Sequence, residues 1–113
     1  MFQLAEAQRF MAAEGIDAWL LHDYRGSNLF FWQVLGVSRA PTRRAMLVVP
    51  LSGAPVLVIH TVDQFFFHDV AIEKCIYRGW EEMRVLLREL LGTARRIAAE
   101  YSEDGAVPNA AFV

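Results

Sequence analysis

Residues 45–60, AMLVVPLSGAPVLVIH, contain two short apolar runs separated by turn-forming residues. The runs Ala45–Val49 and Val56–His60 are rich in β-branched side chains, which favour strands. Residues 50–55 between them include the proline, serine and glycine that turns require. This stretch therefore predicts an antiparallel β-hairpin, around which the rest of the chain must form its layers.

Before the hairpin, the sequence predicts a helix and a strand. In residues 2–14 apolar side chains recur at helical spacing, and Gly15 supplies a left-handed stop. Residues 16–21 are apolar apart from Asp17, as in a strand that is covered on both faces. Residues 22–26 are then expected to form a polar loop.

Two aromatic segments are expected to form short helices. Ser27 can cap a helix over residues 28–33, which Gly36 would end, and Thr61 can cap a second helix over residues 61–68. Helices this short cannot bury aromatic rings on every side. We therefore expect most rings of the two segments, LFFW and FFF, to lie in the core and some to face another body.

The clearest helix lies in the second half of the chain. Its apolar stripe, opposed by charged residues, consists of Trp80, Met83, Leu86, Leu87, Leu90 and Leu91. Gly92 follows as a stop, and strands are expected on either side, over residues 71–77 and 97–101. Residues 107–113 are expected to continue without a closing element.

This order of elements predicts an α/β fold, a mixed sheet with helices on both faces in three layers, α/β/α. A chain of 113 residues can bury one core but not two, which indicates a single domain. Its hydrophobic fraction of 55% exceeds the usual value of about 45–50%. We therefore expect part of the apolar surface to be covered by a partner.

Composition excludes several classes of function. The net charge of −2, with scattered basic residues, argues against nucleic acid as a partner. No apolar stretch approaches the ~18 residues of a membrane span, and the amino-terminal residues do not resemble a secretion signal, so we expect no membrane and a cytoplasmic location.

Cys75 is the only cysteine, which excludes an internal disulfide and a metal site of several thiolates. We expect it to be a small buried residue.

Candidates for a hydrolytic metal site are few, because such a site needs at least three converging ligands. Histidine and aspartate are neighbours in three places, His22 with Asp23, His60 with Asp63, and His68 with Asp69. Each pair lies at the margin of an element, which favours a role in capping or at the surface. The pairs would matter only if the first strand lay in the middle of the sheet, where all three could share one rim.

Other catalytic patterns are also weak. Ser27 follows Gly26 but lacks the second glycine of a nucleophile elbow, and no glycine-rich phosphate loop is present. Arg43 and Arg44, at the start of a strand, could present guanidinium groups to a carboxylate on a substrate or a neighbouring chain. The plainer interpretation of this pair is a solvated strand end.

Several strings resemble the amino-terminal domain of the prolidase, aminopeptidase P and creatinase family. They are AAEGIDA (residues 12–18), DYRGSN (23–28), TRRAMLVVP (42–50), GAP (53–55), VIH (58–60), EYS (100–102) and AVP (106–108). Each string is weakly specific, and their order and spacing together carry the resemblance over nearly the whole chain. Residues 109–111, NAA, depart from the usual continuation.

The resemblance implies a ribonuclease-H-like fold with a mixed, mostly five-stranded sheet. It divides the chain into a creatinase/prolidase-type domain (residues 1–102) and the start of a linker (103–113) toward a catalytic domain beyond the chain. In peptidases of the family that catalytic domain holds two divalent metal ions, Mn, Co or Zn, so no cofactor and no catalytic residue is expected here. The parent would be a metallopeptidase acting next to proline or a creatinase-like amidinohydrolase.

In relatives this domain mediates contacts between subunits and lends side chains to the rim of a neighbouring active site. The expected partners are therefore the chain's own catalytic domain and a second copy, in a homodimer. Candidates for the rim or interface are Arg25, Trp32, Arg43, Arg44 and His60.

Two other functions stay open. The chain could be an independent binding module that uses its aromatic helix and Arg43–Arg44 to hold a carboxylate ligand or a partner protein. It could also be a small hydrolase built on His60 and Asp63, which the sparse ligand set disfavours.

Overall fold

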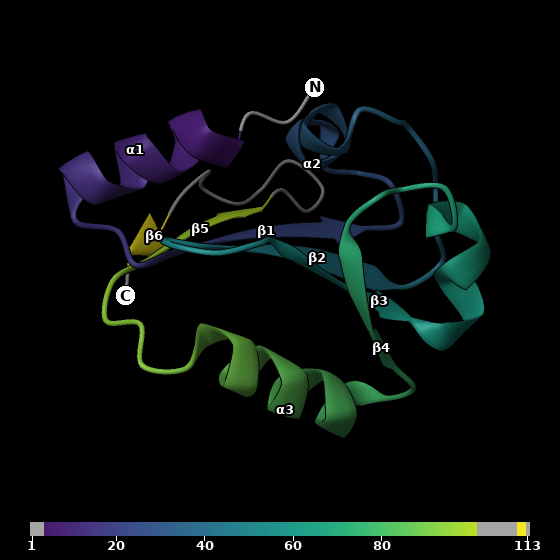
Figure 1. Cartoon of the computed structure of the whole chain (residues 1–113). Coiled ribbons are helices and arrows are strands. Elements are labelled where there is room, and N and C mark those ends of the chain that lie inside the picture. Colours follow the sequence, from purple (N-terminus) through teal and green to yellow (C-terminus); the bar gives the residue numbers. More distant parts are fainter. Residues whose placement is uncertain (1–3, 102–110, 113) are drawn as a thin grey trace.

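The computed structural model describes residues 4–101 and 111–112, and it shows a mixed sheet between two helical layers (Figure 1). The strands are β1 (Ala18–Tyr24), β2 (Arg44–Pro50), β3 (Val56–His60), β4 (Glu73–Tyr77), β5 (Ile97–Tyr101) and β6 (Ala111–Phe112). The helices are α1 (Leu4–Glu14), α2 (Leu29–Leu35), α3 (Trp80–Leu91) and the 3-10 helix η1 (Thr61–Phe67). Helices α1 and α2 cover one face of the sheet and α3 covers the other, which confirms the predicted three layers.

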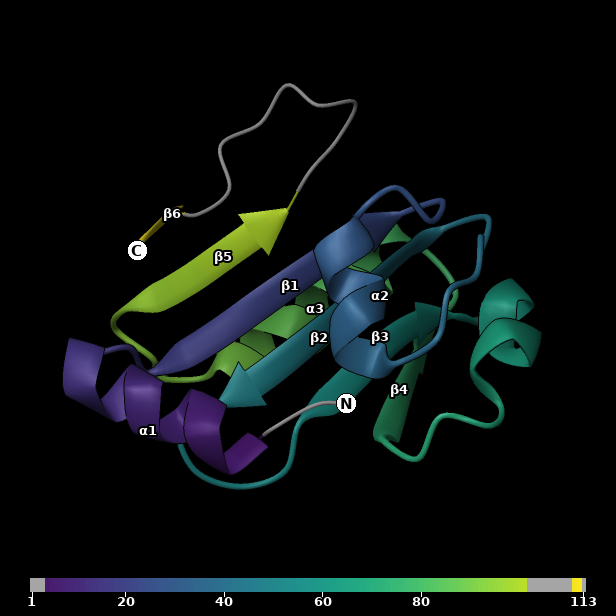
Figure 2. The same ribbon diagram turned by 90° about the horizontal axis from the view of Figure 1, so that it is seen from above.

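The strand order is β4-β3-β2-β1-β5-β6, with β1 in the interior (Figure 2). The predicted hairpin is confirmed, because β2 and β3 pair in antiparallel fashion. Strand β1 is antiparallel to β2 and parallel to β5, while β4 joins β3 in parallel. As a result β1, β3 and β4 end at the same edge at which β2 begins.

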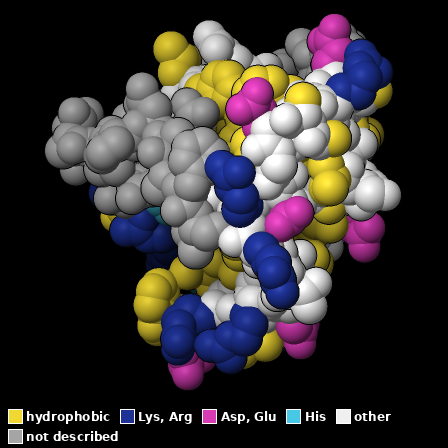
Figure 3. All heavy atoms as spheres, turned by 90° about the vertical axis from the view of Figure 1, so that its left-hand side faces the viewer, with side chains coloured by type: hydrophobic (Ala, Val, Ile, Leu, Met, Phe, Trp, Pro, Cys, Tyr) yellow, Lys and Arg dark blue, Asp and Glu magenta, His cyan; other side chains and the backbone are white. Residues whose placement is uncertain are grey.

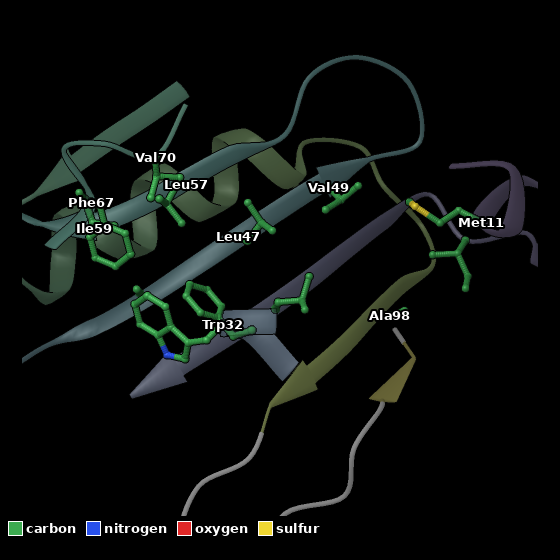
Figure 4. Close-up of a cluster of buried hydrophobic side chains, with 13 residues drawn as sticks. Met11, Trp32, Leu47, Val49, Leu57, Ile59, Phe67, Val70 and Ala98 are labelled. Carbon is green, nitrogen blue, oxygen red and sulfur yellow. The ribbon is translucent and has the colours of Figure 1, made fainter. Parts of the chain in front are cut away.

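The sheet separates two apolar cores. Alternate residues of β2 face opposite sides, so that Leu47 and Val49 join the core under α1 and α2, whereas Met46 joins the core under α3. Figure 4 shows the first of these cores, to which Met11 of α1 and Trp32 of α2 contribute. Each fully buried leucine or valine side chain contributes about 1.5–3 kcal/mol, and this burial holds the layers together.

Helix α3 has the bounds that its apolar stripe predicts. Met83 is buried, and Leu86, Leu87 and Leu90 pack against the second core. Trp80 departs from the stripe, since 66% of it is exposed at the first position of the helix. The exposed indole lies beside the edge at which the strands end.

The first strand lies further along the chain than predicted. Strand β1 extends to Tyr24, so Asp23 lies inside a strand rather than in a loop, and it is fully buried. Its two carboxylate oxygens accept hydrogen bonds from the backbone N–H groups of Gly26 and Asn28, each at 2.8 Å. These bonds satisfy the buried carboxylate, which explains how a polar residue can occupy the strand.

Both predicted helix caps are wrong by one residue. Asn28 caps α2, because its Oδ1 accepts from two backbone N–H groups of the first turn. Ser27 instead donates its hydroxyl hydrogen to the carbonyl oxygen of Tyr24. His60 caps η1 through Nδ1 in the place expected for Thr61. A side-chain oxygen or an unprotonated imidazole nitrogen can satisfy the same backbone donors, so sequence alone does not separate these choices.

Near the carboxyl end, Ala111–Phe112 pair with β5 as the short strand β6, which corrects the expectation of no closing element. The pairing adds a sixth, two-residue strand to the five expected. The domain boundary predicted at residue 102 lies outside the described residues. None of the helices in the described part is long and apolar enough to cross a bilayer.

Candidate functional site

A pocket of about 680 Å³ lies at the edge where β1, β3 and β4 end and β2 begins. Its lining comes from the ends of four strands and the start of α3, and comprises Tyr24, Arg25, Thr42, Arg43, Arg44, His60, Tyr77, Arg78, Gly79, Trp80 and Met83. We call it the arginine pocket. Strand pairing places Tyr24 beside Arg44 and His60 beside Tyr77, so residues that are distant in sequence meet here.

Among the residues that the structure describes, the lining of this pocket contains four arginines and no acidic residue. Arg25 and Arg43 are exposed, and Arg78 lies 3.8 Å from the carboxylate of Glu82, just outside the lining. The opposite end of the molecule differs, because acidic and basic side chains are interspersed there (Figure 3). A concentration of guanidinium groups without lining carboxylates favours binding of an anion.

Arg44 is held in one orientation at the base of the pocket. Its guanidinium group stacks over the Tyr24 ring, 4.6 Å from the ring centroid, and its Nη1 lies 2.9 Å from Nε2 of His22. Arginine can only donate, so His22 must accept through Nε2 and carry its proton on Nδ1. This arrangement reduces the conformational freedom that Arg44 would lose on binding a ligand.

Tyr77 and His60 form the floor beside Arg44. The buried Tyr77 hydroxyl donates a 2.6 Å hydrogen bond to the Arg44 carbonyl oxygen, and its ring meets the His60 ring edge to face at 5.1 Å. Burial raises the pKa of Tyr77 to about 12, with a smaller contribution from the charge of Asp63. The phenol is therefore a neutral donor at physiological pH.

The imidazole of His60 is engaged at both nitrogens. Nδ1 accepts from the backbone N–H of Val62 at 3.1 Å, and Nε2 lies 3.0 Å from the carbonyl oxygen of Arg78. A carbonyl oxygen can only accept, so Nε2 carries the proton. His60 thus joins the end of β3 to the segment after β4.

Asp63 fixes the entry into β2. It is 2% exposed, and its Oδ1 accepts from the backbone N–H and the hydroxyl of Thr42, at 3.0 and 2.9 Å. Its Oδ2 accepts from the backbone N–H of Arg43 at 2.8 Å. These bonds position Arg43 at the pocket, and they occupy the carboxylate that a hydrolase built on His60 and Asp63 would require.

Four of the five residues predicted for a rim or interface meet in the arginine pocket, namely Arg25, Arg43, Arg44 and His60. Trp32 does not join them. It is 3% exposed and its ring stacks on Phe67 at 5.6 Å, because α2 packs it into the first core. The exposed members of the two aromatic segments are Leu29 and Phe65.

The pocket also contains Tyr24, Tyr77, Arg78 and Trp80, which were not among the predicted site residues. The predicted order of strands and helices could have indicated these residues. A helix between two strands favours a parallel pair, and parallel strands end at one edge, which would place Tyr77 and Arg78 beside His60.

No group of three or more potential metal ligands occurs among the described residues. The three histidine–aspartate pairs do not converge as a ligand set. Asp69 is bound to Arg39, and Nδ1 of His68 lies 2.8 Å from the carbonyl oxygen of Phe65. Cys75 is half-buried against the second core rather than fully buried, and burial raises the pKa of its thiol.

Comparison with known proteins supports the fold. No family model matches the chain, and no match was found among curated proteins. One similar solved structure is the creatinase/prolidase N-terminal domain of an X-Pro dipeptidase from Streptococcus pyogenes, with a TM-score of 0.69 and 19% identity over 86% of this chain and 74% of that chain. A proline dipeptidase from Streptococcus pneumoniae gives a TM-score of 0.71 and 18% identity over 88% of this chain and 74% of that chain.

A third similar structure, the dipeptidase PepE from Mycobacterium ulcerans, gives a TM-score of 0.68 and 21% identity. The match covers 93% of this chain but only 28% of that one. At these identities the likeness establishes the fold. It confirms the three-layer α/β/α class with a mixed, mainly five-stranded sheet, of the creatinase/prolidase N-terminal domain type.

Proposed function

We propose that this chain is the non-catalytic amino-terminal domain of an Xaa-Pro dipeptidase-like hydrolase and that its arginine pocket shapes the substrate entrance. The fold supports this assignment, because it matches the corresponding domain of an X-Pro dipeptidase over 86% of the chain. The observation that carries the proposal is the pocket itself, whose described lining includes Arg25, Arg43 and Arg44 and no carboxylate.

The hydrolytic chemistry of such a parent belongs to a separate domain with two divalent metal ions. The described residues of this chain do not fit that role, because they bring no three potential ligands together. Asp63 is buried near the pocket, and both of its carboxylate oxygens accept hydrogen bonds from backbone and hydroxyl donors. The contribution of this domain is therefore binding and positioning.

The arginine pocket is suited to the carboxylate of a small substrate or of a neighbouring subunit. Guanidinium groups bind carboxylates through paired, charge-assisted hydrogen bonds, each contributing about 1.5–3 kcal/mol. Arg44 is already oriented by Tyr24 and His22, and Asp63 holds the backbone of Arg43 through one hydrogen bond. In a homodimer the pocket would complete the entrance to the active site of the catalytic domain.

Steady-state kinetics of the proposed parent hydrolase, with an Xaa-Pro dipeptide and Mn²⁺, tests this function. Arg43→Gln is expected to raise KM roughly tenfold to a hundredfold with kcat little changed, because a binding contact is lost. The matched control is Arg95→Gln at the opposite end of the sheet, for which KM should not change. Metal-dependent hydrolysis by the 113-residue chain alone would contradict the proposal.

An independent carboxylate-binding module is the second candidate function. The arginines of the pocket favour it, since its described lining has no acid and could bind an anion without a second domain. Calorimetric titration of the isolated chain with proline dipeptides separates the two. Saturable binding by the chain alone favours the module, whereas binding only in the presence of the catalytic domain favours the entrance role.

A further inference from the structure

A second cavity, of about 450 Å³, continues from the arginine pocket beneath α3. The two cavities share Arg44, Trp80 and Met83, so they meet along the first turn of the helix. We call the second cavity the apolar groove. Beyond the shared residues its walls are largely hydrophobic, and they include Leu20 of β1 and Leu87 of α3.

The groove exists because α3 does not cover its whole face of the sheet. The buried residues that pack beneath the helix, Met46, Val58 and Tyr77, come from β2, β3 and β4. On the neighbouring strands, Leu20 of β1 and Ala99 of β5 are only half-buried. The side chain of Ala99 is too small to fill the space between α3 and the sheet, so the apolar groove remains open there.

Charge divides the combined site into two ends. Arg43 lines the pocket and Arg44 lines both cavities, while the described lining of the groove has no acid and its other titratable member is His22. Trp80 lies at the junction with 66% of its surface exposed, and the guanidinium group of Arg84 lies over its ring, 6.0 Å from the centroid. Glu82 is outside both linings and accepts a hydrogen bond from the backbone N–H of Arg78.

We propose that the arginine pocket and the apolar groove together bind one small amphipathic monocarboxylate, of the arylalkanoic or medium-chain fatty acid class. The carboxylate lies on Arg43 and Arg44, and the apolar body extends past Trp80 and Met83 toward Leu87. The cavity volumes are within the roughly 300–1,000 Å³ of small-molecule sites. This inference rests on the second candidate function, carboxylate binding by the arginine pocket of the chain alone, and adds the apolar half of the ligand.

Titration of the 113-residue chain with three probes, followed by calorimetry and by the NMR signal of the Trp80 indole N–H, tests the inference. The probes are 4-phenylbutyrate, its uncharged analogue 4-phenylbutanol, and acetate. We expect 4-phenylbutyrate to bind at least tenfold more tightly than either of the others. Equal affinities for 4-phenylbutyrate and 4-phenylbutanol would overturn the two-ended site.

Two exposed residues allow variants that should fold. Trp80→Ala is expected to weaken 4-phenylbutyrate binding about tenfold and acetate binding far less, whereas Arg43→Gln should weaken the binding of both acids. Phe65→Ala and Arg95→Gln are the matched controls, an exposed aromatic and a basic residue away from the site, and should change neither affinity.

The pattern of loss separates the two proposals. If Arg43→Gln weakens both acids but 4-phenylbutyrate binds no better than acetate, the groove is not a ligand site and the carboxylate role stands. If Arg43→Gln has no effect on either acid, the carboxylate role fails and the inference fails with it.

Discussion

The hydroxyl group of Tyr77 donates a 2.6 Å hydrogen bond to the carbonyl oxygen of Arg44, across the intervening strand β3. This bond ties the end of β4 to the start of β2 at the floor of the arginine pocket. The same phenol ring supports His60 edge to face. The position of Arg44 therefore depends on a residue 33 positions away in sequence.

Tyr77→Phe is expected to lower the free energy of unfolding by about 1–2 kcal/mol at pH 7, because one buried hydrogen bond is lost. Urea unfolding of both proteins measures the difference. Burial raises the pKa of Tyr77 to about 12, so the fold favours the neutral phenol. This contribution is complete below the unfolded pKa of about 10 and is lost as the pH rises through 12.

The stability gap between wild type and Tyr77→Phe should therefore narrow above about pH 10. Absorbance of tyrosinate near 295 nm gives an independent measurement. In the folded wild type one tyrosine should ionise only near pH 12, and this transition should be missing from Tyr77→Phe. A gap that stays constant up to pH 12 would show that Tyr77 is not protected from ionisation.

The ion pair between Arg39 and Asp69 predicts that the stability of the fold decreases at low pH. Arg39 binds the carboxylate through both of its terminal nitrogens, at 2.7 and 3.0 Å, and this bond lowers the pKa of Asp69 to about 2. Because the pKa of Asp69 is lower in the folded state, the ion pair stabilises the fold above the unfolded pKa of about 3.8. This stabilisation is lost as the pH falls through 2. Asp69→Asn should lower Tm at pH 7, and the difference should shrink between about pH 4 and pH 2.

Differential scanning calorimetry over this pH range measures the effect of Asp69→Asn. Glu81→Gln is the control, because it removes the ion pair with Arg84 in which the Glu81 side chain is 81% exposed. Exposed pairs of this kind contribute little to stability, so its Tm should change less. An Asp69→Asn difference that persists at pH 2 would show that the amide disturbs packing rather than charge.

Trp32 is buried, yet its Nε1 has no hydrogen-bond partner among the described residues. Trp32→Phe removes this unpaired donor, whose burial costs about 1–3 kcal/mol, and that gain offsets part of the lost packing. We expect a change within about 1 kcal/mol for Trp32→Phe, against a loss of about 3–5 kcal/mol for Trp32→Ala. A large loss in urea unfolding of Trp32→Phe would indicate that Nε1 bonds to a group outside the described residues.

Local sequence patterns predicted the elements that packing alone decides. The two apolar runs of the hairpin and the stripe from Met83 to Leu90 became β2, β3 and α3, because each has a continuous or periodic apolar surface that must be buried. Asp23 could not be placed in this way. In the sequence alone an aspartate favours a loop, because a strand can bury its carboxylate only when backbone donors, here Gly26 and Asn28, bind it.

The residues of the candidate site could likewise be predicted only where the neighbouring sequence places them. Arg43 and Arg44 could be nominated from their place at the start of a strand, whereas Tyr77 and Trp80 were missed because their membership depends on strand order. Trp32 was nominated as an aromatic anchor, but the periodicity of a seven-residue helix does not show which of its rings turns inward.

Gly26 and Gly36 form a natural pair for separating backbone strain from steric clash. Both have a φ of +81°, which costs an L-residue roughly 1–2 kcal/mol. A Cβ at Gly26 would lie 2.7 Å from the carbonyl oxygen of Arg39, whereas one at Gly36 would meet nothing within 4 Å. Gly36→Ala should therefore cost about 1–2 kcal/mol, and Gly26→Ala about 2–5 kcal/mol, since overpacking adds a further 1–3.

The clash at Gly26 also has a consequence for the arginine pocket. Gly26 follows Arg25, and its backbone N–H binds Asp23, so displacement of this turn moves one wall of the pocket. Gly26→Ala should weaken acetate binding as well as stability, whereas Gly36→Ala should lower stability alone. Urea unfolding and acetate titration of the two variants measure both effects. Equal stability losses, with acetate binding unchanged in both, would mean that the segment around Arg39 yields without disturbing the pocket.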